Sequence, residues 1–122
     1  MDRLDDHALE DVAGYFRALS VPLRLKILNA LRDGERNVTE LTAALGCSQA
    51  NVSKHLALLA QGGFIERTAR GTNTYYRIAD PKIYGLCNLV CGQIGKRYAA
   101  QSTRQDMFLA ASAPRRRSRS GA

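Results

Sequence analysis

The sequence predicts a mostly α-helical fold with one small β-hairpin, in the order helix, helix, helix, helix, hairpin, helix. Apolar residues recur at helical spacing in five segments, and two β-rich stretches follow the fourth of them directly. The third and fourth helices are short and are joined by a tight turn that contains glycine. Such a pair is a helix-turn-helix, and a hairpin directly after it is a wing. We therefore predict a winged helix-turn-helix.

The first two helices are defined by an apolar repeat and by one proline. The first should run from about His7 to Leu19 and stop before Pro22. Pro22 suits the first turn of the second helix, where no hydrogen bond requires its missing N–H. This second helix should end at Gly34. The apolar stripes of the two helices are Leu9, Val12, Phe16 and Leu19, and then Leu23, Ile27, Leu28 and Leu31.

The third and fourth helices have recognisable start signals. Asn37 followed three residues later by Glu40 predicts a capping box, and Gly46 should end the third helix. Ser48 is a suitable N-cap for the fourth helix, which the glycines at 62 and 63 should end. The inward residues are expected to be Val38, Leu41 and Leu45 in the third helix, and Val52, Leu56 and Leu59 in the fourth.

The hairpin and a fifth helix complete the predicted domain, residues 1–100. Strands at 64–68 and 74–78 flank a turn at 70–73. Asp80 and Pro81 predict the start of the fifth helix. Its apolar face is expected to hold Ile83, Cys87, Val90 and Ile94. Residues 101–122 are predicted to be a basic, disordered tail, because the P-R-R-R-S-R-S-G-A run cannot bury a core.

Composition favours a polyanionic partner and a reducing compartment. The formal net charge is +7, and basic residues lie in the middle of the chain as well as near its end. Each phosphate that a cation neutralises releases condensed counterions, so this charge suits nucleic acid. Three cysteines make no disulfide framework, the acidic start has no apolar signal core, and no apolar run approaches the ~20 residues that span a bilayer. We expect a cytoplasmic protein.

The fourth helix carries the main indication of function. With Val52, Leu56 and Leu59 turned inward, its outer face and flanks hold small or polar residues and one cation. A helix that enters the major groove needs such a face, because bulky residues would keep it away from the base edges. The residues expected to contact DNA here are Ser48, Gln49, Ala50, Ser53 and Lys54.

Each polar residue of this set suits a particular contact. Gln49 lies at the end of the helix that usually reaches the bases, and its amide can pair with an adenine edge through two hydrogen bonds. Ser53 can contact a base or a phosphate, Lys54 suits a phosphate, and Ser48 can offer its hydroxyl and N–H to a phosphate oxygen. The alternative interpretation is an ordinary solvated helix face.

The hairpin adds a basic and polar finger, which favours the DNA-binding interpretation. A wing uses such residues on the phosphate backbone or in the minor groove. The wing residues expected at DNA are Arg67, Arg70, Thr72 and Asn73, and Thr74 and Arg77 add to the same character. Tyr75 and Tyr76 are expected to pack under the hairpin, with at most one hydroxyl reaching a phosphate.

Three stretches together resemble the ArsR/SmtB family of bacterial metalloregulatory repressors. They are L-R-L-K-I-L-N-A-L, then V-T-E-L-T-A-A-L-G-C-S-Q-A-N-V-S-K-H-L-A-L-L-A-Q-G-G-F-I-E-R, then G-T-N-T-Y-Y-R-I-A-D-P. The resemblance covers roughly residues 8–98 without large gaps. It implies a homodimer built on the first and fifth helices. It also implies an operator in duplex DNA, an imperfect inverted repeat, that is released when an inducer binds.

Two metal sites of that family are absent from this sequence. The cysteine pair of an arsenic-sensing version would fall in residues 40–44, which contain no cysteine. A zinc-sensing version uses an aspartate, two histidines and a carboxylate near the last helix, and of these Asp80 alone fits. The other three positions hold Lys82, Gln93 and Lys96. His7 and His55 are the only histidines, and their spacing offers no metal site.

Cys87 and Cys91 remain as a candidate sensor for a soft metal or metalloid inducer. Residues four apart meet on one helix face, with β-carbons about 5–6 Å apart, which is too far for an unstrained disulfide. Two thiolates can instead converge on trivalent arsenic or antimony, and a twofold axis would double their number. The alternative is that both are small apolar packing residues. Cys47 is expected to pack the turn.

Three other functional classes compete with an inducible repressor. A nucleoid-type or RNA-binding protein without an inducer could use the same basic face. A redox-switched regulator could use the same cysteines. An enzyme is not expected, because no cysteine and histidine form a pair with an orienting group, and no obligatory cofactor is predicted. The arginine-rich end is expected to bind phosphates without sequence preference, or to be a solubilising tail with no further function.

Overall fold

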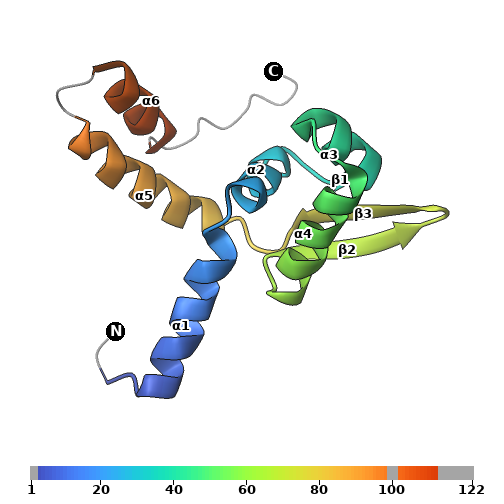
Figure 1. Ribbon diagram of the computed structural model, residues 1–122, viewed down its shortest axis with the longest axis horizontal. Helices are drawn as coiled ribbons and strands as arrows, with labels where there is room; N and C mark the ends of the chain where they lie inside the picture. Colours follow the sequence, from blue (N-terminus) through green and yellow to red (C-terminus); the bar gives the residue numbers. More distant parts are fainter. Residues whose placement is uncertain (1–2, 99–101, 113–122) are drawn as a thin grey trace. The chain divides into compact units, whose positions relative to one another are not determined.

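The computed structural model describes residues 3–98 and 102–112 of the chain (Figure 1). The chain divides after Asp80 into two compact units. The first holds α1 (Asp6–Leu19), α2 (Pro22–Ala30), β1 (Arg36–Asn37), α3 (Val38–Leu45), α4 (Gln49–Gln61), β2 (Ile65–Arg70) and β3 (Asn73–Ile78). The second holds α5 (Ile83–Arg97) and α6 (Ser102–Ser112). The predicted winged helix-turn-helix order is confirmed.

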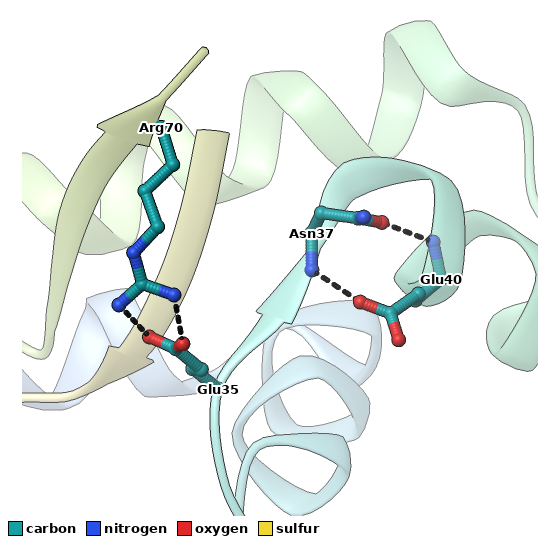
Figure 2. A network of polar contacts seen from close by, with 4 residues as sticks. All are labelled: Glu35, Asn37, Glu40 and Arg70. Carbon is teal, nitrogen blue, oxygen red and sulfur yellow. Dashed lines mark hydrogen bonds and ion pairs between the residues drawn. The ribbon is translucent and has the colours of Figure 1, made fainter. Parts of the chain in front are cut away.

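Local hydrogen bonds set the boundaries of the helix-turn-helix, α3 and α4. The N–H of Glu40 donates to Oδ1 of Asn37 over 2.8 Å, and the N–H of Asn37 donates to Oε1 of Glu40 over 2.9 Å (Figure 2). Gly46 ends α3 with a φ of 65°, which a side chain would disfavour. The hydroxyl of Ser48 then accepts the N–H of Asn51 over 3.2 Å and caps α4. Both predicted caps are confirmed.

The core of the first unit lies between α2, α3, α4 and the sheet. Its fully or nearly fully buried residues are Ile27, Leu28, Leu31, Leu41, Val52, Leu56, Leu59, Phe64, Ile65 and Tyr76. Burying one such side chain stabilises the fold by about 1.5–3 kcal/mol. The inward face predicted for α4 is confirmed, whereas Leu23, Val38 and Leu45 are only partly buried. The position of α4 is therefore fixed by its apolar face, and the opposite face stays at the surface.

The wing is a three-stranded antiparallel sheet with strand order β1-β3-β2. The predicted hairpin is confirmed, with a two-residue turn in which Gly71 has a φ of 62°. In β3, Tyr76 lies between Arg36 of β1 and Arg67 of β2. Strand β1 was not predicted, because two residues show no periodicity. It joins the sheet directly to the N-cap of α3.

The second unit corrects two predictions about the last part of the chain. Helix α5 begins at Ile83 and not at Pro81, because residues 81–85 first form tight turns with hydrogen bonds from Tyr84 to Pro81 and from Gly85 to Lys82. Val90, expected on the packed face of α5, is 45% exposed within this chain. Ile83 is buried as predicted.

The expectation of a disordered tail is wrong for residues 102–112, which form α6. This segment contains apolar residues that pack on α5. A β-carbon at Gly95 would lie 3.0 Å from Cδ2 of Leu109, and the rings of Tyr98 and Phe108 stack with centroids 5.8 Å apart. Of the arginines in the predicted tail, Arg104 lies in α6, and the four in residues 114–122 lie outside the described residues. None of the described helices has the length and hydropathy of a membrane span.

Candidate nucleic-acid interface

The outer face of α4 lies at the protein surface, opposite the buried residues Val52, Leu56 and Leu59. Four of the five residues predicted to contact DNA from this helix are exposed, and the fifth is partly buried. The exposed ones are Ser48, Gln49, Ala50 and Lys54, and the partly buried one is Ser53. The structure thus leaves the predicted set accessible at the surface, with Ser53 less exposed than the others.

Asn51 also belongs to this surface but was missing from the predicted set. Its side chain is exposed in the first turn of α4, one turn before Lys54. An amide at this position can read a base edge in the same way as that of Gln49. The signal was present in the sequence, because Asn51 lies three residues before Lys54 and close to the helix N-terminus.

A single arginine of α2 connects α4 to the end of α1. Nε of Arg24 donates to Nδ1 of His55 in α4 over 3.1 Å. Nη1 of the same guanidinium donates to the carbonyl oxygen of Ala18 over 3.2 Å. Partial burial lowers the pKa of His55, and the positive charges of Arg24 and Lys54 lower it further. The neutral imidazole that this hydrogen bond requires is therefore the favoured form.

The wing carries its predicted residues at the surface, but one of them is paired within the chain. Arg67, Thr72 and Asn73 are exposed. The guanidinium of Arg70 forms an ion pair with Glu35, with two contacts of which one joins Nη2 to Oε2 over 3.1 Å (Figure 2). The hydrogen bond to Glu35 raises the pKa of Arg70, and the charge of Glu35 raises it further.

Two further contacts engage arginines of the wing within the chain. The Arg70 guanidinium also lies over the ring of Tyr75, 5.0 Å from its centroid. Nε of Arg77 donates to Oε1 of Glu66 on the neighbouring strand over 3.1 Å. Tyr76 is buried and Tyr75 partly buried, as expected of residues that pack against the hairpin. The net positive character of the wing is thus smaller than a count of its arginines suggests.

The candidate sensor residues Cys87 and Cys91 are both partly buried on α5. Their spacing places them on one side of the helix, where two thiols can approach one ion. Cys47 lies in the turn between α3 and α4, and its Sγ is 3.5 Å from the carbonyl oxygen of Leu45. Within residues 3–98 and 102–112, no three His, Cys, Asp or Glu residues are grouped as a metal site requires.

The fold and this surface define a DNA-binding protein of the winged helix-turn-helix class. The model of the bacterial regulatory protein family arsR matches residues 21–67, which run from α2 through the recognition helix into the wing. The probable mercury resistance operon repressor of Streptomyces lividans is 36% identical over 80 residues, which are 66% of this chain and 64% of that protein. The transcriptional repressor PagR of Bacillus anthracis is 34% identical over 89 residues, which are 72% of this chain and 89% of that protein.

Solved structures agree with these relatives. The homodimeric winged helix-turn-helix DNA-binding domain Mb0332 of Mycobacterium bovis has a TM-score of 0.65 and 33% identity, over 84% of this chain and 95% of that one. The antimony-specific transcriptional repressor AntR has a TM-score of 0.68 and 32% identity, over 80% and 88%. The chain belongs to the ArsR/SmtB family of DNA-binding transcriptional repressors. Membership confirms the expectation that it is a regulator and not an enzyme.

Proposed function

We propose that this protein is an inducible repressor that binds an imperfect inverted repeat in duplex DNA as a homodimer. The observation that carries the proposal is the exposed, small and polar face of α4 opposite its fully buried apolar face. In this interpretation Gln49 and Ser53 read base edges, while Ser48 and Lys54 bind phosphates and Ala50 permits close approach. The homodimeric Mycobacterium bovis relative supports two copies on one operator.

The wing is proposed to bind the DNA backbone or the minor groove next to the site read by α4. Arg67, Thr72 and Asn73 are exposed and can contact phosphates directly. For Arg70 such a contact would compete with Glu35, because Nη1 and Nη2 of its guanidinium already contact that carboxylate. Arg67 is therefore the stronger candidate for a phosphate contact in the wing.

Exposed apolar residues on α1 and α5 support dimerisation through these helices. Phe16 is 51% exposed and Leu9 is 39% exposed on α1. On α5, Leu89 is 63% and Val90 is 45% exposed. Covering such side chains with a second copy removes apolar surface from water and favours association. This would also explain why the predicted inward stripes of both helices are not fully buried within one chain.

The inducer is proposed to be a thiophilic species, trivalent arsenic or antimony, held by Cys87 and Cys91. Soft thiolate ligands favour such ions over harder ones. One chain supplies two neighbouring thiols on α5, and the homodimer would supply four. A mercury resistance repressor and an antimony-specific repressor among the relatives agree with this class of inducer. A redox switch through the same thiols is the second candidate.

The test is DNA binding by the purified protein, with and without arsenite, antimonite, zinc, cadmium and oxidants. The probe is a labelled duplex that the protein itself selects from a pool of random sequences, compared with a scrambled duplex of the same composition. Strong preference for the selected duplex supports a repressor. Equal binding to both supports a nucleoid-type protein, and tighter binding to RNA than to either duplex would contradict the proposal.

A further inference from the structure

The guanidinium of Arg24 lies where three helices of the first unit meet. It belongs to α2, and its hydrogen bonds reach the carbonyl oxygen of Ala18 at the end of α1 and Nδ1 of His55 in α4. Arg24 and His55 are 31 residues apart and both are partly buried. A planar guanidinium with several donors in a fixed fork can hold two acceptors at once, whereas a lysine ammonium lacks this geometry.

We propose that Arg24 is a positioning residue for DNA recognition, which acts through His55 to fix α4 against the end of α1. The inference rests on the proposed reading of DNA by α4. His55 lies in the middle of α4, between Lys54 and the buried Leu56. A hydrogen bond to its ring can therefore restrict rotation of the helix about its own axis. A small rotation would move Gln49 and Ser53 relative to the base edges.

The link matters because α1 is the helix proposed to meet the second chain. Two half-sites present their grooves about one helical turn apart, so the spacing of the two α4 helices must match them. Apolar packing through Leu56 and Leu59 holds α4 in the core, but the hydrophobic effect itself is not directional. The hydrogen bonds from Arg24 are directional, and they define where α4 lies relative to the end of α1.

The contact depends on the protonation of His55. Nδ1 can accept a hydrogen bond only while it carries no proton. Protonation would turn this acceptor into a donor and would add a positive charge beside Arg24 and Lys54, the two charged groups that act on the ring. Two acids of neighbouring elements are engaged elsewhere, Glu40 of α3 in the capping box and Glu66 of β2 with Arg77. Acidification should therefore break the link.

The first experiment compares variants at 24 and 55 on the selected and the scrambled duplex. Arg24→Met removes both hydrogen bonds, and Arg24→Lys keeps the charge but not the fork. The matched control is Lys26→Met, which removes one exposed cation from the same helix. Both Arg24 variants should bind the selected duplex about tenfold more weakly, which is the effect expected for losing the one hydrogen bond that reaches α4, with a smaller change on the scrambled duplex. Lys26→Met should weaken both duplexes alike.

A double-mutant cycle with His55→Leu tests whether the two residues act together. Once His55→Leu is present, Arg24→Met should add little further loss on the selected duplex. Additive losses would overturn the proposal, as would Arg24→Lys binding like the wild type. So would a lower melting temperature with unchanged affinity of the folded protein, because that is a purely structural role. Loss of discrimination by the wild type itself would instead contradict the proposed function.

The second experiment measures how the DNA affinity of the folded protein depends on pH. His55→Asn places an amide oxygen near the position of Nδ1, so it can accept from Arg24 without titrating. As the pH falls from about 7.5, wild-type affinity for the selected duplex should fall relative to this variant, and the fall should come below the ordinary histidine pKa of about 6.5, because the pKa of His55 is lowered in the folded protein. Parallel pH profiles, or a wild-type affinity that rises on acidification, would overturn the proposal.

Discussion

Arg70 in β2 and Glu35, the residue before β1, form a two-point ion pair across the wing (Figure 2). β1 follows Glu35 directly and ends at Asn37, which caps α3. The pair therefore ties the wing to the start of the helix-turn-helix. It also places a carboxylate next to a guanidinium that was expected to bind DNA, so a phosphate and Glu35 compete for Arg70.

Glu35→Gln is expected to release Arg70 and to tighten binding to both the selected and the scrambled duplex. The salt dependence should become steeper by about one unit, because one more phosphate is neutralised. Fluorescence anisotropy over a series of salt concentrations measures both changes. Arg70→Ala in the otherwise unchanged protein should have little effect on binding. If it weakens binding as much as Lys54→Ala does, the arginine leaves Glu35 in the complex.

Gln49→Ala is expected to relax base preference at one position in each half-site, at a cost of ~1–3 kcal/mol in binding free energy. The matched variant Lys54→Ala should weaken all duplexes alike and flatten the salt dependence. Affinities for a panel of single-base changes in the selected duplex separate the two patterns. An unchanged affinity and preference for Gln49→Ala would mean that another face of α4, or another residue such as Asn51, reads the bases.

Local signals explain why much of this site could be predicted from the sequence. The Asn37–Glu40 and Ser48–Asn51 caps depend on residues three apart, and the buried face of α4 depends on helical spacing, so both are visible along the chain. The pairing of Arg70 with Glu35 joins residues 35 apart. No periodicity reveals which of several wing arginines finds a carboxylate.

Two other features were not predicted, the contact between Arg24 and His55 and the helix α6. The contact between Arg24 and His55 depends on how α2 packs against α4, which follows only from the fold. The predicted tail is wrong at residues 102–112 because the basic composition that predicts disorder belongs to residues 114–122 and does not extend to them. Met107, Phe108 and Leu109 gave a local apolar signal that the tail assignment ignored.

Removal of residues 114–122 is expected to lower affinity for any duplex and to reduce the salt slope. The segment carries four arginines, which can neutralise phosphates without reading bases. The ratio of affinities for the selected and the scrambled duplex should stay nearly the same. Titrations of the full-length and shortened proteins at two salt concentrations test this. A collapse of that ratio would show that the arginines read a groove.

Folding stability is expected to fall on acidification through His55. Its pKa is lowered in the folded protein, first by burial and then by Arg24 and Lys54. Below the ordinary pKa of about 6.5, the unfolded chain binds a proton that the folded chain resists, so the unfolded state is favoured. The contribution is complete above that pH and declines as the pH falls below it. Urea unfolding of wild type and His55→Asn over this range should show a difference that grows with acidity, and parallel curves would contradict it.

Arsenite or antimonite is expected to release the wild-type protein from the selected duplex through Cys87 and Cys91. A single ion must draw both thiols to one centre, which would shift α5 and with it the proposed dimer surface around Leu89 and Val90. Such a shift changes the spacing of the two recognition helices. The ligand acts only through its preference for the arrangement that does not bind DNA, a coupling of typically ~1–3 kcal/mol.

Serine substitutions separate this sensor from packing and from redox chemistry. Cys87→Ser and Cys91→Ser should each stay bound at a dose of arsenite that releases the wild type, measured by anisotropy under reducing conditions. Cys47→Ser is the matched control and should still respond, because its thiol lies in the turn before α4. A double variant at 87 and 91 that responds like the wild type would make both residues packing groups. Release by an oxidant but not by soft metals would identify a redox switch, through bridges between the two subunits.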